Sequence, residues 1–236
     1  MMLYTNGDSH TAAAEAMNPH GFAADDSRYF YLGQAPHPDN LAVSWSKRLS
    51  EPLKMGMHCH AQAGCSNTRI LRTTREFLTK LEHLKHNWFM IIQWSTWERE
   101  EWLYQDSYYQ VGASGIDSVP PELQDRYREF VTSVDWEQKT QYWHNEIWQL
   151  HQELDCHKIP HIFFNGDQDF DIIPDNLRHN WGTSYIGPYD PSQTYAGYLK
   201  SKNIQTVAPD SWHYGPDGHS AWARFLMQYI ITNKLV

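Results

Sequence analysis

The chain of 236 residues has little cysteine and no long apolar run. Its three cysteines are too few and too scattered for a disulfide framework, and no two of them form a C-x-x-C pair of the kind that binds metals. No segment approaches the ~18 consecutive apolar residues of a membrane-spanning helix. The amino terminus shows no signal peptide. We therefore expect a protein that is made and kept in a reducing compartment, or that leaves the cell by a route the sequence does not show.

Basic residues are also scarce. The chain carries 28 acidic and 19 basic side chains, which gives a formal net charge of −9. Nucleic acids and anionic membranes select for basic surfaces, so this balance argues against both as partners.

Aromatic residues, in contrast, are abundant, with 11 tryptophans and 14 tyrosines. Rings of this kind fill cores, and at surfaces they stack on sugars or bury at interfaces. Most of the aromatics, including Trp94, Trp97, Trp143 and Trp148, are expected in the core, and a few could line a carbohydrate platform.

Short apolar runs alternate with segments of helical periodicity. The expected strands are residues 2–5, 55–60, 88–93 and 159–164. The expected helices are residues 66–84, 143–154 and 221–230, with a further one around 39–49. Alternation of this kind predicts a parallel sheet with helices on both faces.

Three segments interrupt the alternation. Residues 18–38, 98–135 and 165–190 are rich in turn-forming residues, and we interpret them as irregular insertions, the second as a lid or an excursion. With no repeats and no linker, the chain is expected to form one domain over residues 1–236.

A small-residue turn, "NGDSHT", follows the first expected strand and leads into an Ala-rich helix expected at Thr11–Met17. It places Ser9 where an α/β fold holds a nucleophile or an anion, although Ser9 could equally serve as a helix cap. Near the other end, Asp210 and His213 stand three residues apart, a spacing that can bring a carboxylate against an imidazole. They could also simply close a loop.

Three segments together resemble the SGNH, or GDSL-like, hydrolases. They are "NGDSHT", "AQAGCSNTRILRTTREFL" and "DSWHYGPDGHSAWA". The overall sequence pattern is also similar to uncharacterised members of the family from marine phages. The resemblance implies a three-layer α/β/α, flavodoxin-like fold with a mostly parallel five-stranded sheet. It also implies ester hydrolysis through an acyl-serine intermediate.

Carried over residue by residue, the resemblance implies Ser9 as nucleophile, His213 as general base and Asp210 as the carboxylate that orients His213. The backbone N–H groups of Ser9 and Gly64 would stabilise the oxyanion. No metal and no organic cofactor are implied.

The family's third motif, which supplies an Asn to the oxyanion hole, is absent. In the corresponding segment, "IIQWSTWERE", Ser95 stands where the Asn would be. A serine hydroxyl can donate one hydrogen bond but has a shorter reach. Asn67 is a possible substitute, and Asn165 is a more distant one.

Other groups of polar residues could carry chemistry, but each also has an ordinary structural explanation. Asp217 and His219 are a rival pair, but His219 lies at a helix start, where a buried capping role is favoured. His58 and His60 could chelate a metal from one face of a strand, although a chance pair is favoured in a chain with 14 histidines. Cys65 is interpreted as a small buried residue rather than a nucleophile.

A further segment, Asp167–Asp171, begins like a calcium loop but lacks its glycine and its final acidic ligand, so we expect no calcium there.

The sequence thus predicts a serine esterase or acetylesterase for a small-molecule or carbohydrate ester, located in the cytoplasm or in a virion. One alternative is a weak or inactive protein of this fold that binds carbohydrate or is a structural part of a larger particle. A transferase with the same triad is another, because the two reactions differ only in what attacks the acyl-enzyme.

Overall fold

The computed structural model describes residues 1–17, 36–80, 87–112, 115–116 and 119–236. Its centre is a sheet of parallel strands: β1 (Met2–Asn6), β2 (Gly56–Cys59), β3 (Trp88–Trp94) and β6 (His161–Asn165). The strand order is β2-β1-β3-β6. The four expected strands are therefore confirmed to within two residues at each end, and the fold is α/β with a parallel sheet.

The sheet has four strands within the described residues, not the five expected. Where a fifth would pair with β6, Phe163 and Tyr185 form an isolated parallel bridge. Gly187 then takes a left-handed conformation (φ +47°), and Pro188, which has no N–H, follows it. Pairing consequently stops after one bridge.

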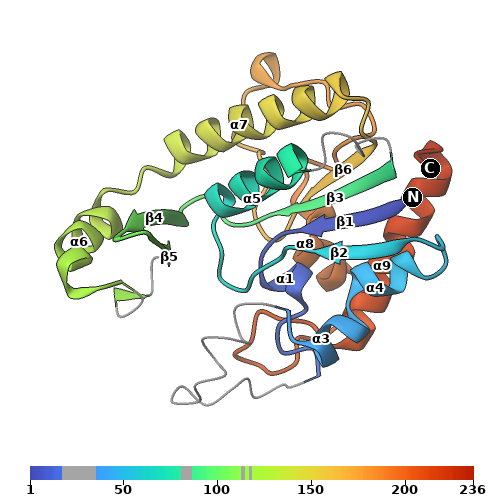
Figure 1. Ribbon diagram of the computed structural model, residues 1–236, viewed down its shortest axis with the longest axis horizontal. Helices are drawn as coiled ribbons and strands as arrows, with labels where there is room; N and C mark the ends of the chain where they lie inside the picture. The colour runs from blue at the N-terminus through green and yellow to red at the C-terminus, as the bar shows by residue number, and fades with distance from the viewer. Residues whose placement is uncertain (18–35, 81–86, 113–114, 117–118) are drawn as a thin grey trace.

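Helices cover both faces of the sheet (Figure 1). On one face lie α5 (Asn67–Lys80) and α7 (Trp136–Cys156), whose apolar side chains join those of the sheet in one cluster. On the other face α4 (Trp45–Ser50), α8 (Tyr195–Ser201) and α9 (Pro216–Asn233) enclose a second cluster. The expected layers of helix, sheet and helix are present.

The helix expected around residues 39–49 is divided in two. Ser44 adopts an extended conformation that ends α3 (Pro38–Val43), and its hydroxyl accepts a hydrogen bond from Lys47 N as the cap of α4. Serine competes for backbone hydrogen bonds in this way, which periodicity does not register. The end of the helix expected at 66–84 lies outside the described residues.

The helix expected at Thr11–Met17 is wrong. In its place is the short α1 (Ser9–Ala12), followed by left-handed backbone at Ala13 (φ 55°) and Glu15 (φ 61°). The high helix propensity of alanine is overridden here by contacts that Glu15 makes with a distant loop.

Residues 98–135 form an excursion rather than an irregular loop. They contain an antiparallel hairpin of β4 (Glu100–Tyr104) and β5 (Ser107–Val111), then η3 (Pro121–Leu123) and α6 (Gln124–Ser133). Figure 1 shows this unit extending beyond the sheet at the left, and it has an apolar cluster of its own.

The expected insertions at residues 18–38 and 165–190 have separate outcomes. Of 18–38, residues 18–35 lie outside the described part of the chain. The segment 165–190 is largely irregular, as expected, and holds only the short η4 (Asp175–Leu177); η5 (Pro191–Gln193) follows it. Among the helices that the structure describes, none is long and apolar enough to cross a membrane.

Candidate active site

The carboxyl edge of the sheet gathers the candidate residues. Strand β1 lies between β2 and β3, so the chain's connections diverge between β1 and β3. In open parallel sheets ligands bind outside the strand ends at such a switch point. Ser9 follows β1 directly, and Ser95 follows β3.

The turn that presents Ser9 is fixed by a buried glutamine from β3. Gln93 Oε1 accepts hydrogen bonds from Asp8 N (3.2 Å) and Thr11 Oγ1 (2.8 Å), while its Nε2 donates to Asp8 Oδ1 (2.8 Å). A Cβ on Gly7 would lie 2.5 Å from Thr11 Oγ1, so glycine is required there. Ser9 thereby stands at the first position of α1.

Hydrogen-bond donors are free around Ser9. Within the described ranges, the Ser9 hydroxyl, the Ser9 N–H and the Gly64 N–H make no hydrogen bond to another protein group. Gly64 lies in a turn (φ +71°) that is tied to the Ser9 turn, because Gln62 N and Cys65 Sγ both donate to Gly7 O, at 3.1 and 3.3 Å. Two backbone donors and one hydroxyl are thus available at this edge.

The carboxylate that contacts His213 is Glu15. His213 Nδ1 donates to Glu15 Oε2 at 2.9 Å, and Ser211 Oγ donates to the same oxygen at 2.7 Å. The hydrogen bond from His213 lowers the pKa of the Glu15 carboxyl against the effect of its partial burial. With Nδ1 occupied, the Nε2 lone pair of His213 is available as a base.

The expectation that Asp210 orients His213 is therefore corrected. Asp210 lies exposed in a turn of the preceding loop, whereas Ser211 and the left-handed Glu15 complete the contact with His213. The three-residue spacing permits a carboxylate–imidazole contact, but this loop directs the Asp210 side chain to solvent.

A second imidazole–carboxylate pair lies beside the first. His10 Nε2 is 3.0 Å from Asp167 Oδ2, and the rings of His10 and His213 meet edge to face at 5.9 Å between centroids. Burial lowers the pKa of His10, but the Asp167 carboxylate outweighs burial and the net pKa is raised. The ring contact places His213 next to the residue that follows Ser9.

Of the three amide or hydroxyl candidates for the oxyanion hole, Asn67 is already engaged. Its Nδ2 donates to Ser95 O (3.0 Å) and its Oδ1 accepts from Ser95 N (2.7 Å). The Ser95 hydroxyl accepts from Arg99 Nη1 at 3.0 Å, and the same nitrogen lies 3.5 Å from Asp8 Oδ2. Asn67 thus positions Ser95, and Ser95 in turn contacts a guanidinium. Asn165 Oδ1 accepts from Tyr185 OH, and its Nδ2 is buried without a partner among the described residues.

The other residues that the sequence offered for catalysis or metal binding lie in structural surroundings or at the surface. His219 is buried, with its Nδ1 accepting from Trp45 N at 3.3 Å, and Asp217 is exposed. Burial raises the pKa of the Cys65 thiol to about 12, which opposes thiolate chemistry. The rings of His58 and His60 lie 4.3 Å apart, packed with other aromatic rings of the first cluster.

Most tryptophans named above are core residues, as expected: Trp94, Trp97 and Trp143 are buried. Trp212, in contrast, is 79% exposed and directly precedes His213. A groove of about 350 Å³ opens beside Asp167 and is lined by Trp136, which is half-exposed. Aromatic surface is therefore available next to the candidate base.

Sequence reasoning missed Glu15, Arg99 and the pairing of His10 with Asp167. No local pattern marks them, since each contact joins segments far apart in the chain. A different cluster that could hold a metal, His151, Asp155 and His161, lies at the opposite end of the sheet.

No family model matches the chain, and no curated protein matches it. Among solved structures, a psychrotrophic esterase, EstA from Pseudoalteromonas sp., in a form inhibited by monoethylphosphonate, is similar over 99% of this chain and 98% of its own, with 12% identity and a TM-score of 0.45. A carbohydrate esterase, whose active site is described as having divergent catalytic and non-catalytic binding functions, is similar over 98% of this chain and 64% of its own, with 13% identity and a TM-score of 0.45.

Proposed function

We propose that the protein is a serine esterase that uses Ser9, His213 and Glu15. The observation that carries the proposal is the hydrogen bond from His213 to Glu15, made where the His213 ring meets that of His10. His10 directly follows Ser9, whose hydroxyl makes no hydrogen bond within the described part of the chain. A carboxylate that holds the imidazole in one tautomer and stabilises its cation is the arrangement that activates a serine.

The reaction has two halves. His213 Nε2 takes the proton of Ser9, whose Oγ attacks the ester carbonyl, and the alcohol leaves with that proton. Water, deprotonated by His213, then attacks the acyl-serine; the bond to Ser9 Oγ breaks, His213 returns the proton to that oxygen, and the acid is released. The Ser9 and Gly64 N–H groups bind the oxyanion in both halves.

Arg99 is the third donor in this proposal. The Asn of the resembling family is missing, and at its place Ser95 holds the guanidinium of Arg99. A cation near the developing oxyanion supplies the stabilisation that an amide would otherwise give. Asp8 balances the charge of Arg99 in the resting protein.

The acyl group is expected to sit on a carbohydrate. The exposed indole of Trp212 directly precedes the base, and sugar rings stack on such faces. The net acidic charge of the chain favours a neutral substrate over a polyanion.

The test is the rate at which a fluorophosphonate labels Ser9, read by peptide mass spectrometry. Label on Ser9 is expected in the parent chain and is lost in Ser9→Ala. Glu15→Gln should slow labelling about 10²–10⁴-fold, because the imidazole loses its orienting charge, and Arg99→Gln about 10–100-fold.

Asp210→Asn is the matched control, since Asp210 is exposed and Glu15 is not. Its labelling rate should equal that of the parent. A slow Asp210→Asn together with a normal Glu15→Gln would contradict the assignment. No label on a folded sample would favour the alternative, a protein of this fold that binds carbohydrate without turning it over.

A further inference from the structure

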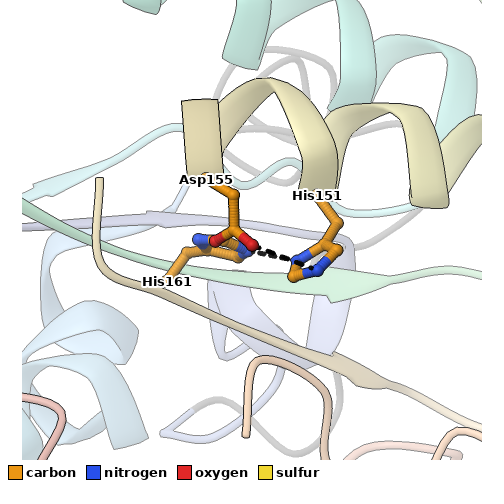
Figure 2. A group of neighbouring side chains, drawn as sticks. All are labelled: His151, Asp155 and His161. Atoms are coloured by element: carbon orange, nitrogen blue, oxygen red, sulfur yellow. Dashed lines mark hydrogen bonds and ion pairs between the residues drawn. The ribbon is translucent and has the colours of Figure 1, made fainter. Parts of the chain in front are cut away.

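Two histidines and an aspartate lie together where α7 ends and β6 begins. His151 and Asp155 stand one helical turn apart on α7, and His161 is the first residue of β6 (Figure 2). The strand runs about 13 Å from His161 to its other end at Asn165, near which the candidate active site lies. The group therefore takes no part in that site.

The three side chains point at one another. His151 Nδ1 and His161 Nε2 are 2.9 Å apart, and His151 Nε2 is 3.4 Å from Asp155 Oδ2. One possible ligand atom from each residue falls within 4.8 Å of the others. Both imidazoles are buried, whereas the carboxylate is 61% exposed.

His161 is held in the tautomer that a metal requires. Its Nδ1 lies 2.8 Å from Ile159 O, and a carbonyl oxygen only accepts, so Nδ1 carries the proton. The lone pair of His161 is then on Nε2 and is directed at His151. Backbone carbonyls orient metal-binding imidazoles in this way in known sites.

The proton count leaves one contact unsatisfied. If His151 is neutral and donates from Nδ1 to His161, its Nε2 lone pair faces the Asp155 carboxylate, which is another acceptor. If the proton is on Nε2 instead, two imidazole lone pairs face each other at 2.9 Å. In either neutral tautomer two acceptors converge, and either a second proton on His151 or a metal cation removes the conflict.

We propose that His151, Asp155 and His161 bind a divalent cation of the zinc class, which joins the end of α7 to the start of β6. Imidazole nitrogens with one carboxylate suit Zn²⁺, Co²⁺ or Ni²⁺ better than Ca²⁺ or Mg²⁺, which prefer oxygen ligands. Two nitrogens on a tetrahedral zinc are about 3.3 Å apart, so His151 Nδ1 and His161 Nε2 need only a small rotation of the rings to share the ion. The Asp155 carboxylate contacts the other ring nitrogen of His151, and it turns away from that nitrogen to become the third ligand. The exposed side of Asp155 leaves a fourth position for water.

The test is a Co²⁺ titration of the full chain after chelator treatment, read as visible absorption, with thermal unfolding in Zn²⁺ as a second readout. One equivalent should give the absorption of a tetrahedral site, and Zn²⁺ should raise the Tm by several degrees. His161→Gln should abolish both effects. Asp155→Asn, at an exposed position that cannot endanger folding, should weaken Co²⁺ binding at least tenfold.

Two matched controls exclude binding at other histidines. His157→Gln removes an exposed histidine just beyond α7, and His58→Gln removes one of the pair on β2. Both should keep the parent's stoichiometry and affinity. Binding that survives His161→Gln, or that disappears in His58→Gln, would overturn the proposal, as would absence of any binding at millimolar Co²⁺.

Discussion

Glu15 reaches His213 through backbone that a non-glycine residue seldom adopts. Its φ is 61°, and Ala13 two residues earlier is also left-handed. Each such residue costs of order 1 kcal/mol, and this cost persists only where other contacts fix the conformation. Here the contacts are those of the Glu15 carboxylate with His213 and Ser211, so the unusual backbone and the candidate site have one cause.

The exposed side chain of Trp212 leads to a prediction about how the substrate binds. Trp212→Ala should raise KM for an acetylated oligosaccharide about tenfold, because a stacked ring contributes on the order of 1 kcal/mol or more. The kcat should change little, since the indole is exposed and the hydrogen bond of His213 to Glu15 does not involve it. Steady-state kinetics on the two substrate classes check this.

A small aryl acetate supplies the control within the same variant. It needs no platform, so Trp212→Ala should hydrolyse it at the parent's rate. An equal loss on both substrates would show that Trp212 supports the loop of His213 and does not bind sugar.

Single residues were predictable only where their neighbours in the chain determine the environment. Ser9 follows a strand and opens a helix, which local sequence indicates, and His213 lies in a loop bounded by Pro and Gly. Glu15 and Arg99 take their roles from contacts across the sheet edge that no spacing encodes. Asp210 shows the converse: its spacing from His213 suits a carboxylate–imidazole contact, but its side chain is exposed.

At the scale of elements, ion pairs anchor the excursion of residues 98–135 to the body: Lys139 on α7 pairs with Glu100 on β4, and a more buried pair joins α5 to β4. Arg72 on α5 donates two hydrogen bonds of 2.7 Å to the carboxylate of Glu101 on β4. The Glu101 side chain is 1% exposed and that of Arg72 is 27% exposed. The guanidinium also lies over the ring of Tyr108 on β5.

Removing the arginine should therefore be costly. Arg72→Met leaves the buried Glu101 carboxylate without its charged partner and with the neutral Gln110 Nε2 as a remaining donor, and we expect a loss of about 2–3 kcal/mol in the free energy of unfolding. The estimate is below that for a fully buried pair because Arg72 is partly exposed. Urea denaturation measures the change.

The same substitution one turn along the helix is the control. Arg75 pairs with Glu153 on α7, but both side chains are more than a third exposed. Arg75→Met should cost less than about 1 kcal/mol. If the two variants lost equal stability, the hairpin would not be anchored by Arg72.

Elements of regular periodicity were predictable, and interrupted ones were not. The helices α5, α7 and α9 each bury one apolar face, and the strands β1, β3 and β6 are apolar runs buried on both faces, so the sequence places these elements well. Ser44 divides a helix by capping, and the Ala-rich start is unwound by Glu15. The hairpin was missed because β4 and β5 contain many charged and polar residues and bury few side chains.

At the scale of the whole molecule, buried histidines make stability depend on pH. Burial lowers the pKa of His144 to about 4 and that of His219 to about 3. Both are neutral in the folded state at pH 5, whereas unfolded imidazoles titrate near 6.5. The unfolded state therefore binds more protons below pH 6.5, and stability falls as the pH falls.

Other titratable groups affect stability outside the range from pH 7 to pH 5, or oppose the effect of the buried histidines within it. The raised pKa of His10 gives a contribution that is complete below pH 6.5 and is lost as the pH rises through the folded value. The lowered pKa values of Glu15 and Asp167 give contributions that are lost only below the unfolded values near pH 4. Between pH 7 and pH 5, the buried neutral histidines thus set the direction, and His10 offsets part of it.

His219 isolates the effect of one group. Because His219 stays neutral in the folded state and gains a proton on unfolding, lowering the pH from 7 to 5 should reduce the parent's free energy of unfolding by about 2 kcal/mol through this residue. The size follows from the pKa of the unfolded imidazole. His219→Gln loses stability at both pH values, because the acceptor for Trp45 N–H is altered, but its change between them should be about 2 kcal/mol smaller than the parent's. Urea denaturation of both proteins at the two pH values measures this difference. An identical pH dependence would mean that His219 is protonated or exposed before unfolding, and that the packing of α9 against α4 opens in mild acid.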